Sequence, residues 1–96
     1  MQESWTYILR CRDGSYYTGC TTNLDRRIAQ HQSGTLKGYT STRLPVTLVW
    51  SSRFDRIHDA IAVERQIKRW SRRKKEALIR GDMDALRLCA KKKWKQ

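Results

Sequence analysis

The 96-residue sequence is poor in cysteine, in acidic residues and in long apolar runs. Its three cysteines are an odd number without CxxC spacing, which argues against a disulfide framework and against a structural zinc site. No stretch approaches about 18 consecutive apolar residues, and the first four residues lack the basic-then-apolar order of a signal peptide. We therefore expect a cytoplasmic protein without a membrane span, in which Cys11 and Cys20 pack as small hydrophobic residues.

Acidic residues number only 9, against 21 Lys and Arg, so the net charge is +12 at pH 7. A charge excess of this size favours a polyanionic partner, and nucleic acid is the first candidate. An anionic membrane surface is the second, but it requires a long amphipathic helix with Trp, Phe and Leu opposite a basic face. No such helix is evident in the sequence, so we expect DNA as the partner, with RNA as a further candidate, and no membrane.

Segments with strand and helix patterns alternate along one domain, without repeats or linkers. Aromatic and β-branched residues predict three strands, over residues 5–11, 16–20 and 46–51. Apolar periodicity and capping residues predict four helices, over residues 23–31, 56–70 and 71–81 and from Asp82 onward. This order predicts an α/β (α+β) fold, a three-stranded, mainly antiparallel sheet flanked by helices. We assign residues 1–80 to the domain and residues 81–96 to a helical, basic C-terminal extension of it.

The turn at Asp13-Gly14 decides whether two tyrosines of the first hairpin meet. In a two-residue turn, Tyr7 faces Cys20, and the side chains of Tyr7 and Tyr17 point to opposite sides of the sheet. In a three-residue turn, with Gly14 in a left-handed bulge position, the register shifts and both tyrosines share one face. The sequence permits both arrangements, and only the second allows a joint site.

Two polar residues occupy the apolar face of the helix predicted over 23–31. At about 100° per residue, Arg27 and His31 share a face with Leu24 and Ile28, which should point into the fold. A guanidinium and an imidazole held one turn apart at the edge of a core suit a phosphate group. The alternative is that both side chains lean out into solvent from the rim of this face.

Glu64 falls inside the apolar face of the helix predicted over 56–70. A lone carboxylate in such a place costs free energy unless it is paired or binds a cation. One interpretation is a salt bridge to a neighbouring Lys or Arg. The other is a metal ligand, because Mg²⁺ is usually held by few carboxylates together with phosphate oxygens and waters.

These elements together resemble a known family. The segments Trp5-Thr6-Tyr7 and Tyr17-Thr18-Gly19, with a spacing of ten residues, are similar to the two motifs of the GIY-YIG nucleases. Arg27 and His31 follow where that family has its catalytic arginine and its histidine or tyrosine, and Glu64 is similar to its metal-binding glutamate. The resemblance spans roughly residues 5–80 and is to the small single-domain bacterial branch, related to the nuclease module of nucleotide-excision repair.

The motifs also depart from the family pattern. Trp5 and Thr6 replace the Gly and Ile of the first motif, and Thr18 replaces the Ile of the second. Many members carry an Asn near the C-terminal end of the domain, whereas Asn23, the expected helix cap, is the only Asn of this sequence. A stabilising polar contact of the family site is therefore missing.

The resemblance implies a one-metal hydrolysis of a phosphodiester. Tyr7 and Tyr17 would orient or deprotonate the attacking water, for which one of them needs a pKa below the usual value of about 10. Glu64 would hold one divalent metal, Mg²⁺ or Mn²⁺, and Arg27 would clamp the phosphate as negative charge builds up. His31 would orient or assist the base.

Basic residues interleaved with aromatic ones predict the nucleic-acid contacts, since rings can stack on unpaired bases. The expected contacts are Lys37, Tyr39, Arg43, Lys68, Arg69, Trp70, Arg72 and Arg73. This composition favours a DNA endonuclease for single-stranded or branched DNA. The competing hypothesis is a basic domain that binds DNA or RNA without catalysis.

Overall fold

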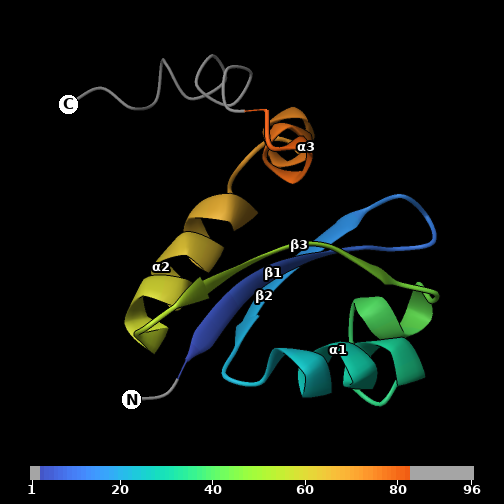
Figure 1. Cartoon of the computed structure of the whole chain (residues 1–96). Coiled ribbons are helices and arrows are strands. Elements are labelled where there is room, and N and C mark those ends of the chain that lie inside the picture. The colour runs from blue at the N-terminus through green and yellow to red at the C-terminus, as the bar shows by residue number, and fades with distance from the viewer. Residues whose placement is uncertain (1–2, 83–96) are drawn as a thin grey trace.

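The computed structural model describes residues 3–82 as a small sheet with helices around it (Figure 1). Its elements in chain order are β1 (Ser4–Arg10), β2 (Tyr16–Thr21), α1 (Leu24–Ser33), the 3₁₀ turn η1 (Thr40–Thr42), β3 (Thr47–Phe54), α2 (Ile57–Lys68) and α3 (Arg72–Arg80). The helix predicted from Asp82 onward lies outside the described residues. None of the helices within residues 3–82 is long and apolar enough to cross a membrane.

The three strands form one antiparallel sheet, as the sequence predicts, and their order in the sheet is β2-β1-β3. β1 is central, so β2 lies at one edge and β3 at the other. β3 continues three residues beyond its predicted end at Ser51, because Ser52, Arg53 and Phe54 still pair with the start of β1. The polar side chains of Ser52 and Arg53 give a weak strand signal, but the ladder with β1 extends over them.

The β1–β2 hairpin adopts the longer of the two turns considered above. The N–H of Cys11 donates to the carbonyl of Ser15 at 2.8 Å, which leaves three residues in the loop. Gly14 has φ +85°, the left-handed conformation that a bulge at this position requires. Tyr7 is consequently paired with Gly19 and Leu9 with Tyr17, which puts both tyrosines on one face of the sheet.

The two faces of the sheet are covered by different helices. Tyr7 and Leu9 belong to a buried cluster with Cys11 and Val46, against which Leu24, Ile28 and Leu44 pack. The helix α1 thus covers the face that carries the two tyrosines. The alternate β1 residues face α2, where the hydroxyl of Thr6 donates to the carbonyl of Ala60 at 2.7 Å.

Local sequence explains where α1 begins and ends. The side chain of Asn23 accepts a hydrogen bond from the backbone N–H of Arg26 at 3.1 Å, which caps the first turn. Gly34 ends the helix at φ +79°, where a side chain would be strained. The helix is therefore held at both ends, and this fixes the positions of the residues that it presents to the sheet.

Candidate active site

A chain of three buried side chains lies at the centre of the α1 face. The Tyr7 hydroxyl is 2.9 Å from Nε2 of His31, and Nδ1 of His31 is 2.8 Å from the hydroxyl of Thr40. His31 is only 3% exposed, so it lies inside the fold and not at the rim of the helix. The strand β1, the helix α1 and the turn η1 each contribute one member.

The protonation state of His31 follows from its surroundings. Burial, and then the positive charge of Arg27, lower the pKa of His31 below its usual 6.5, so the ring is neutral at pH 7. A neutral imidazole has one N–H and one lone pair. Its two nitrogens therefore act as one donor and one acceptor between the hydroxyls of Tyr7 and Thr40, and either tautomer satisfies both contacts.

The pKa of Tyr7 moves opposite to the direction expected for a tyrosine base. Burial, and then the neighbouring Tyr17, raise the pKa of Tyr7 to about 12, although the Arg27 guanidinium acts in the opposite direction. Of the two tyrosines, Tyr7 is therefore not the one with a lowered pKa, because desolvation of the phenolate outweighs the nearby positive charge. If Tyr7 transfers a proton, its neutral partner His31 has to take part in the transfer.

Tyr17 lies over this chain and connects it to the loop before β3. Its ring centroid is 5.2 Å from that of His31 and 6.4 Å from that of Tyr7. On the solvent side it stacks with Tyr39 at 6.2 Å, and the Arg43 guanidinium lies 3.7 Å from the centre of the Tyr39 ring. Arg43 also pairs with Asp13 of the hairpin loop at 3.1 Å. The orientation of Tyr17 is thus fixed from both sides.

Gly19, to which the motif resemblance gave no individual role, lies where Tyr7 approaches β2. A Cβ at Gly19 would lie 2.6 Å from the hydroxyl of Tyr7 and 3.2 Å from the ring of Tyr17. Only glycine leaves room for the Tyr7 hydroxyl to pass over β2 at this point. An isolated Gly inside a strand pattern is a known sign of such close approach, so the signal was present in the sequence.

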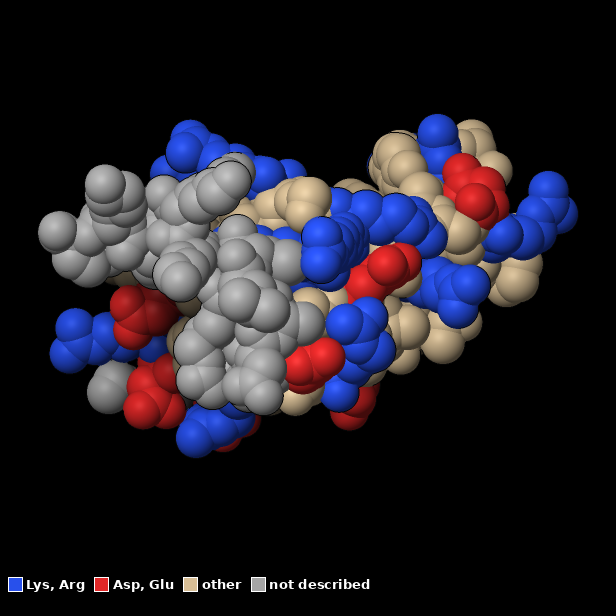
Figure 2. Space-filling model, turned by 90° about the horizontal axis from the view of Figure 1, so that it is seen from above, with Lys and Arg blue, Asp and Glu red and all other residues tan. Residues whose placement is uncertain are grey.

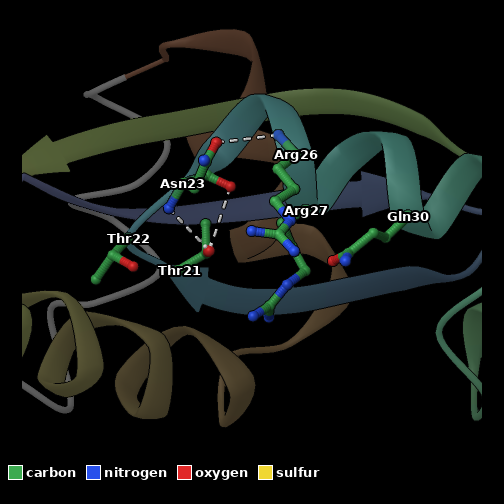
Figure 3. A pocket seen from close by; sticks show the side chains of 6 residues that line it. All are labelled: Thr21, Thr22, Asn23, Arg26, Arg27 and Gln30. Atoms are coloured by element: carbon green, nitrogen blue, oxygen red, sulfur yellow. Dashed lines mark hydrogen bonds between the residues drawn. The ribbon is translucent and has the colours of Figure 1, made fainter.

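Arg27 projects from α1 toward the edge strand β2 (Figure 3). Its charge shifts the pKa of both Tyr7 and His31, which places the guanidinium beside the buried chain. It also lines a polar pocket together with Thr21, Thr22, Asn23, Arg26 and Gln30. Arg27 is therefore available both to the tyrosines and to a ligand in the pocket.

Glu64 reaches the same edge of the sheet from α2. Its Oε1 is 3.8 Å from Sγ of Cys20, and its Oε2 is 3.1 Å from Nζ of Lys68. Burial and then the Glu64 charge raise the pKa of the Cys20 thiol, which consequently stays protonated and donates to the carboxylate. Glu64 is 16% exposed and Lys68 is half exposed, so both interpretations of Glu64 remain compatible with its position.

The donor set around Glu64 fits a hard divalent cation held mainly by its substrate. Within residues 3–82, no three His, Cys, Asp or Glu side chains are grouped to hold a metal ion. Mg²⁺ is commonly bound by one or two carboxylates plus substrate phosphates and waters. An i,i+4 helix ion pair is worth only about 0.3–0.5 kcal/mol, and the Lys68 side chain is half exposed, so Lys68 is a weak competitor for a cation.

The residues predicted to contact nucleic acid fall into two groups. Tyr39 and Arg43 lie at the tyrosine stack, and Lys37 is exposed on the same loop. Lys68 is paired with Glu64 at the β2 edge. Tyr39 and Lys68 each contact a residue of the candidate site, Tyr17 and Glu64 respectively.

The second group lies along α2 and α3. Arg72 covers the ring of Tyr16 at 4.7 Å and pairs with Glu76 at 3.1 Å, so it attaches α3 to the hairpin. Trp70 is half-buried beneath Lys74, whose Nζ is 4.2 Å from the ring, whereas Arg69 and Arg73 are exposed. Figure 2, which views the molecule from the α3 side, shows Lys and Arg side chains in a band across this surface.

The chain is similar to proteins from bacteria and archaea. A UPF0213 protein of Streptococcus pneumoniae is 42% identical over 82 residues, which cover 85% of this chain and 83% of the relative. A UPF0213 protein of Natronomonas pharaonis is 46% identical over 77 residues, which cover 80% of this chain and 91% of the relative.

Solved structures share the architecture. The solution NMR structure of a UPF0213 protein from Bacillus halodurans has a TM-score of 0.56 and 45% identity, covering 83% of this chain and 85% of the other. The solution NMR structure of a protein from E. faecalis has a TM-score of 0.58 and 34% identity, covering 84% and 86%. The model of the GIY-YIG catalytic domain matches residues 3–77, which span the sheet and all the residues of the candidate site. The chain therefore belongs to the GIY-YIG domain family.

Proposed function

We propose that the chain is a metal-dependent endonuclease that hydrolyses phosphodiester bonds of single-stranded or branched DNA. Membership of the GIY-YIG family, whose members are generally endonucleases, supports hydrolysis of a nucleic acid. The observation that carries the proposal is the buried chain Tyr7–His31–Thr40 beside Arg27. Packing of the core alone does not require a neutral imidazole between two hydroxyls.

The buried side chains of Tyr7, His31 and Thr40 provide a route for the proton of the attacking water. With a pKa of about 12, Tyr7 is a poor source of phenolate at neutral pH. When the tautomer leaves Nε2 of His31 unprotonated, Tyr7 can accept the water proton while it passes its own proton to Nε2. Thr40 then accepts a hydrogen bond from Nδ1 of the imidazolium. No free phenolate forms.

Substrate binding has to open this route, because Tyr7 is only 1% exposed. Arg27 lies between the buried chain and the polar pocket, so a bound phosphate draws its guanidinium outward. Tyr17, the more exposed tyrosine, then orients the water against the phosphate. Arg27 remains on the phosphate as negative charge develops there.

Glu64 is the residue that would hold the divalent metal, Mg²⁺ or Mn²⁺. When bound, the metal supplies Lewis-acid polarisation of the phosphate and stabilisation of the leaving oxygen. Lys68 has to release the carboxylate, and the small free energy of an i,i+4 helix pair with a half-exposed lysine permits this. The lone carboxylate makes binding depend on substrate phosphates, so we expect metal and DNA to bind cooperatively.

The competing function, nucleic-acid binding without catalysis, is favoured by one observation. The Glu64–Lys68 ion pair already satisfies the carboxylate, and a cation is not required for that. The two functions assign different roles to Glu64. In the endonuclease it holds the metal, whereas in a binding domain it contributes only to local structure.

The test is cleavage of labelled single-stranded, double-stranded and forked DNA with Mg²⁺, Mn²⁺ or EDTA. We expect cutting with either metal, none in EDTA, and preference for the single-stranded or forked substrate. Glu64→Ala should reduce the rate by at least about 100-fold while binding persists. Glu3→Ala, which removes an exposed carboxylate paired with Arg53 on the far edge strand, is the matched control.

Binding to all three substrates without cleavage, unchanged in Glu64→Ala, would instead identify a binding domain. Cleavage of duplex DNA as fast as of the forked substrate would remove the substrate preference and leave the endonuclease.

A further inference from the structure

A polar pocket of about 280 Å³ opens beside the candidate site, between the start of α1 and the end of β2 (Figure 3). It is lined by Thr21, Thr22, Asn23, Arg26, Arg27 and Gln30, none of which is acidic. Pockets that enclose drug-sized ligands measure roughly 300–1,000 Å³ and are mostly apolar. The size and lining of this pocket suit one small anionic group better than a base or an organic cofactor.

The spacing of α1 brings three donor side chains to the pocket. Arg26 and Gln30 are one turn apart at i and i+4, and Arg27 lies beside them. Figure 3 shows that all three side chains leave the helix on the side that faces β2. Together they offer two guanidiniums and an amide to anionic groups bound at this edge.

The side-chain donors of Arg26 and Gln30 have no partner in the part of the chain that the structure describes. Among residues 3–82, the guanidinium of Arg26 makes no hydrogen bond or ion pair, and the side-chain amide of Gln30 makes no hydrogen bond. Its backbone N–H donates to the side chain of Asn23, which leaves the guanidinium outside the capping interaction. By contrast, Arg43, Arg53 and Arg72 all have carboxylate partners.

Arg27 makes the pocket continuous with the buried chain. The same side chain lines the pocket and shifts the pKa of Tyr7 and His31. An anion held by Arg26 and Gln30 therefore lies next to one held by Arg27. In a nucleic-acid strand, phosphates follow one another along the backbone at a regular spacing.

We propose that Arg26 and Gln30 form a second phosphate site, which binds the DNA backbone phosphate next to the one that Arg27 holds. The assignment builds on the proposed function only in taking a DNA strand as the ligand of this edge. The strand then runs along β2, with its backbone toward α1, and two consecutive phosphates fix its position against Tyr7.

The experiment measures binding of a fluorescent oligothymidylate in EDTA over a series of salt concentrations. Each phosphate contact on single-stranded DNA contributes about −0.7 to the slope of log K against log salt. Arg26→Gln should therefore lower the magnitude of the slope by about 0.7 and weaken binding roughly 5- to 10-fold at low salt. Gln30→Ala should weaken binding about 2- to 3-fold with the slope unchanged, because it removes a neutral donor.

Arg53→Gln is the matched control, because it makes the same charge change on the opposite edge strand β3. It should lose less than about 2-fold in affinity. A strand with an uncharged methylphosphonate backbone should bind wild type and Arg26→Gln equally. Thermal unfolding of each variant verifies that the fold is retained.

Equal losses in Arg26→Gln and Arg53→Gln would overturn the second phosphate site, as would an absence of binding to the strand. Because binding is read without metal, the result is separate from the cleavage experiment. Binding that depends on Arg26 in a protein that never cuts would support this site and refute the endonuclease. Cleavage by a protein in which Arg26→Gln binds the strand as tightly as wild type would support the endonuclease and refute this site.

Discussion

Replacing Tyr7 by Phe tests the buried chain through its effect on the pH dependence of folding. The substitution keeps the ring and removes only the hydroxyl, so core packing is preserved. At neutral pH it leaves one nitrogen of His31 without its partner in the core, which should cost about 1–3 kcal/mol. The larger effect is expected in alkaline solution.

The folded pKa of Tyr7 is about 12, against about 10 in the unfolded chain. Because the folded-state pKa is raised, the stabilisation is fully present below pH 10 and is lost as the pH rises from about 10 to 12. A shift of about two units corresponds to about 2–3 kcal/mol. The advantage of wild type over Tyr7→Phe should therefore shrink to zero in this window and can change sign.

The measurement is urea unfolding of both proteins at several pH values between 8 and about 12, read as the difference in unfolding free energy. Taking the difference removes the contribution of lysines and of the other tyrosines. Tyr39→Phe, at a ring that is 41% exposed, controls for the loss of one phenol outside the core. A difference between wild type and Tyr7→Phe that stays constant from pH 9 to 12 would refute the burial argument and the proton route built on it.

Two further substitutions probe the surroundings of the chain. Gly19→Ala places a methyl group 2.6 Å from the Tyr7 hydroxyl. We therefore expect the free energy of unfolding in urea to fall by about 1–3 kcal/mol and cleavage to be lost. Wild-type behaviour in both assays would contradict the close approach. Thr40→Val removes the hydroxyl that accepts from Nδ1 when His31 is protonated, and the loss of this hydrogen bond to the charged form lowers the pKa of His31 further. The cleavage rate at neutral pH should fall about 10-fold, and its acid limb should move to lower pH. A slower enzyme with an unshifted pH profile would assign Thr40 a purely structural role.

Local patterns in the sequence were sufficient for the parts of the fold that depend on neighbouring residues. The Asp13-Gly14 turn favoured a hairpin, and the structure chose the three-residue loop because Gly14 can adopt positive φ. Helical spacing correctly placed Arg27 and His31 on the same face as Leu24 and Ile28, which pack against the core. These features arise within single elements or tight turns, where spacing determines geometry.

The sequence patterns did not predict the contacts between segments that are distant in the chain. Thr40 meets His31 because the loop before β3 folds back over α1, and nothing in its local sequence specifies that path. The raised pKa of Tyr7 depends on how completely α1 and β2 enclose it, a property of the assembled core. The thiol of Cys20 meets Glu64 only because α2 packs on β2.

The space above Gly19 also bears on how the hairpin forms. During folding, β1 and β2 can pair in several alignments, and a slip of one residue would set Cys20 or Thr18 opposite Tyr7. Either residue would place a Cβ where the native alignment has none, against the hydroxyl that Gly19 accommodates. Misaligned hairpins are thus penalised by the same residue pair that builds the site, and a chain that pairs its strands incorrectly cannot also close α1 over Tyr7. The close approach at Gly19 thus couples selection of the correct strand alignment to assembly of the face that carries the candidate site.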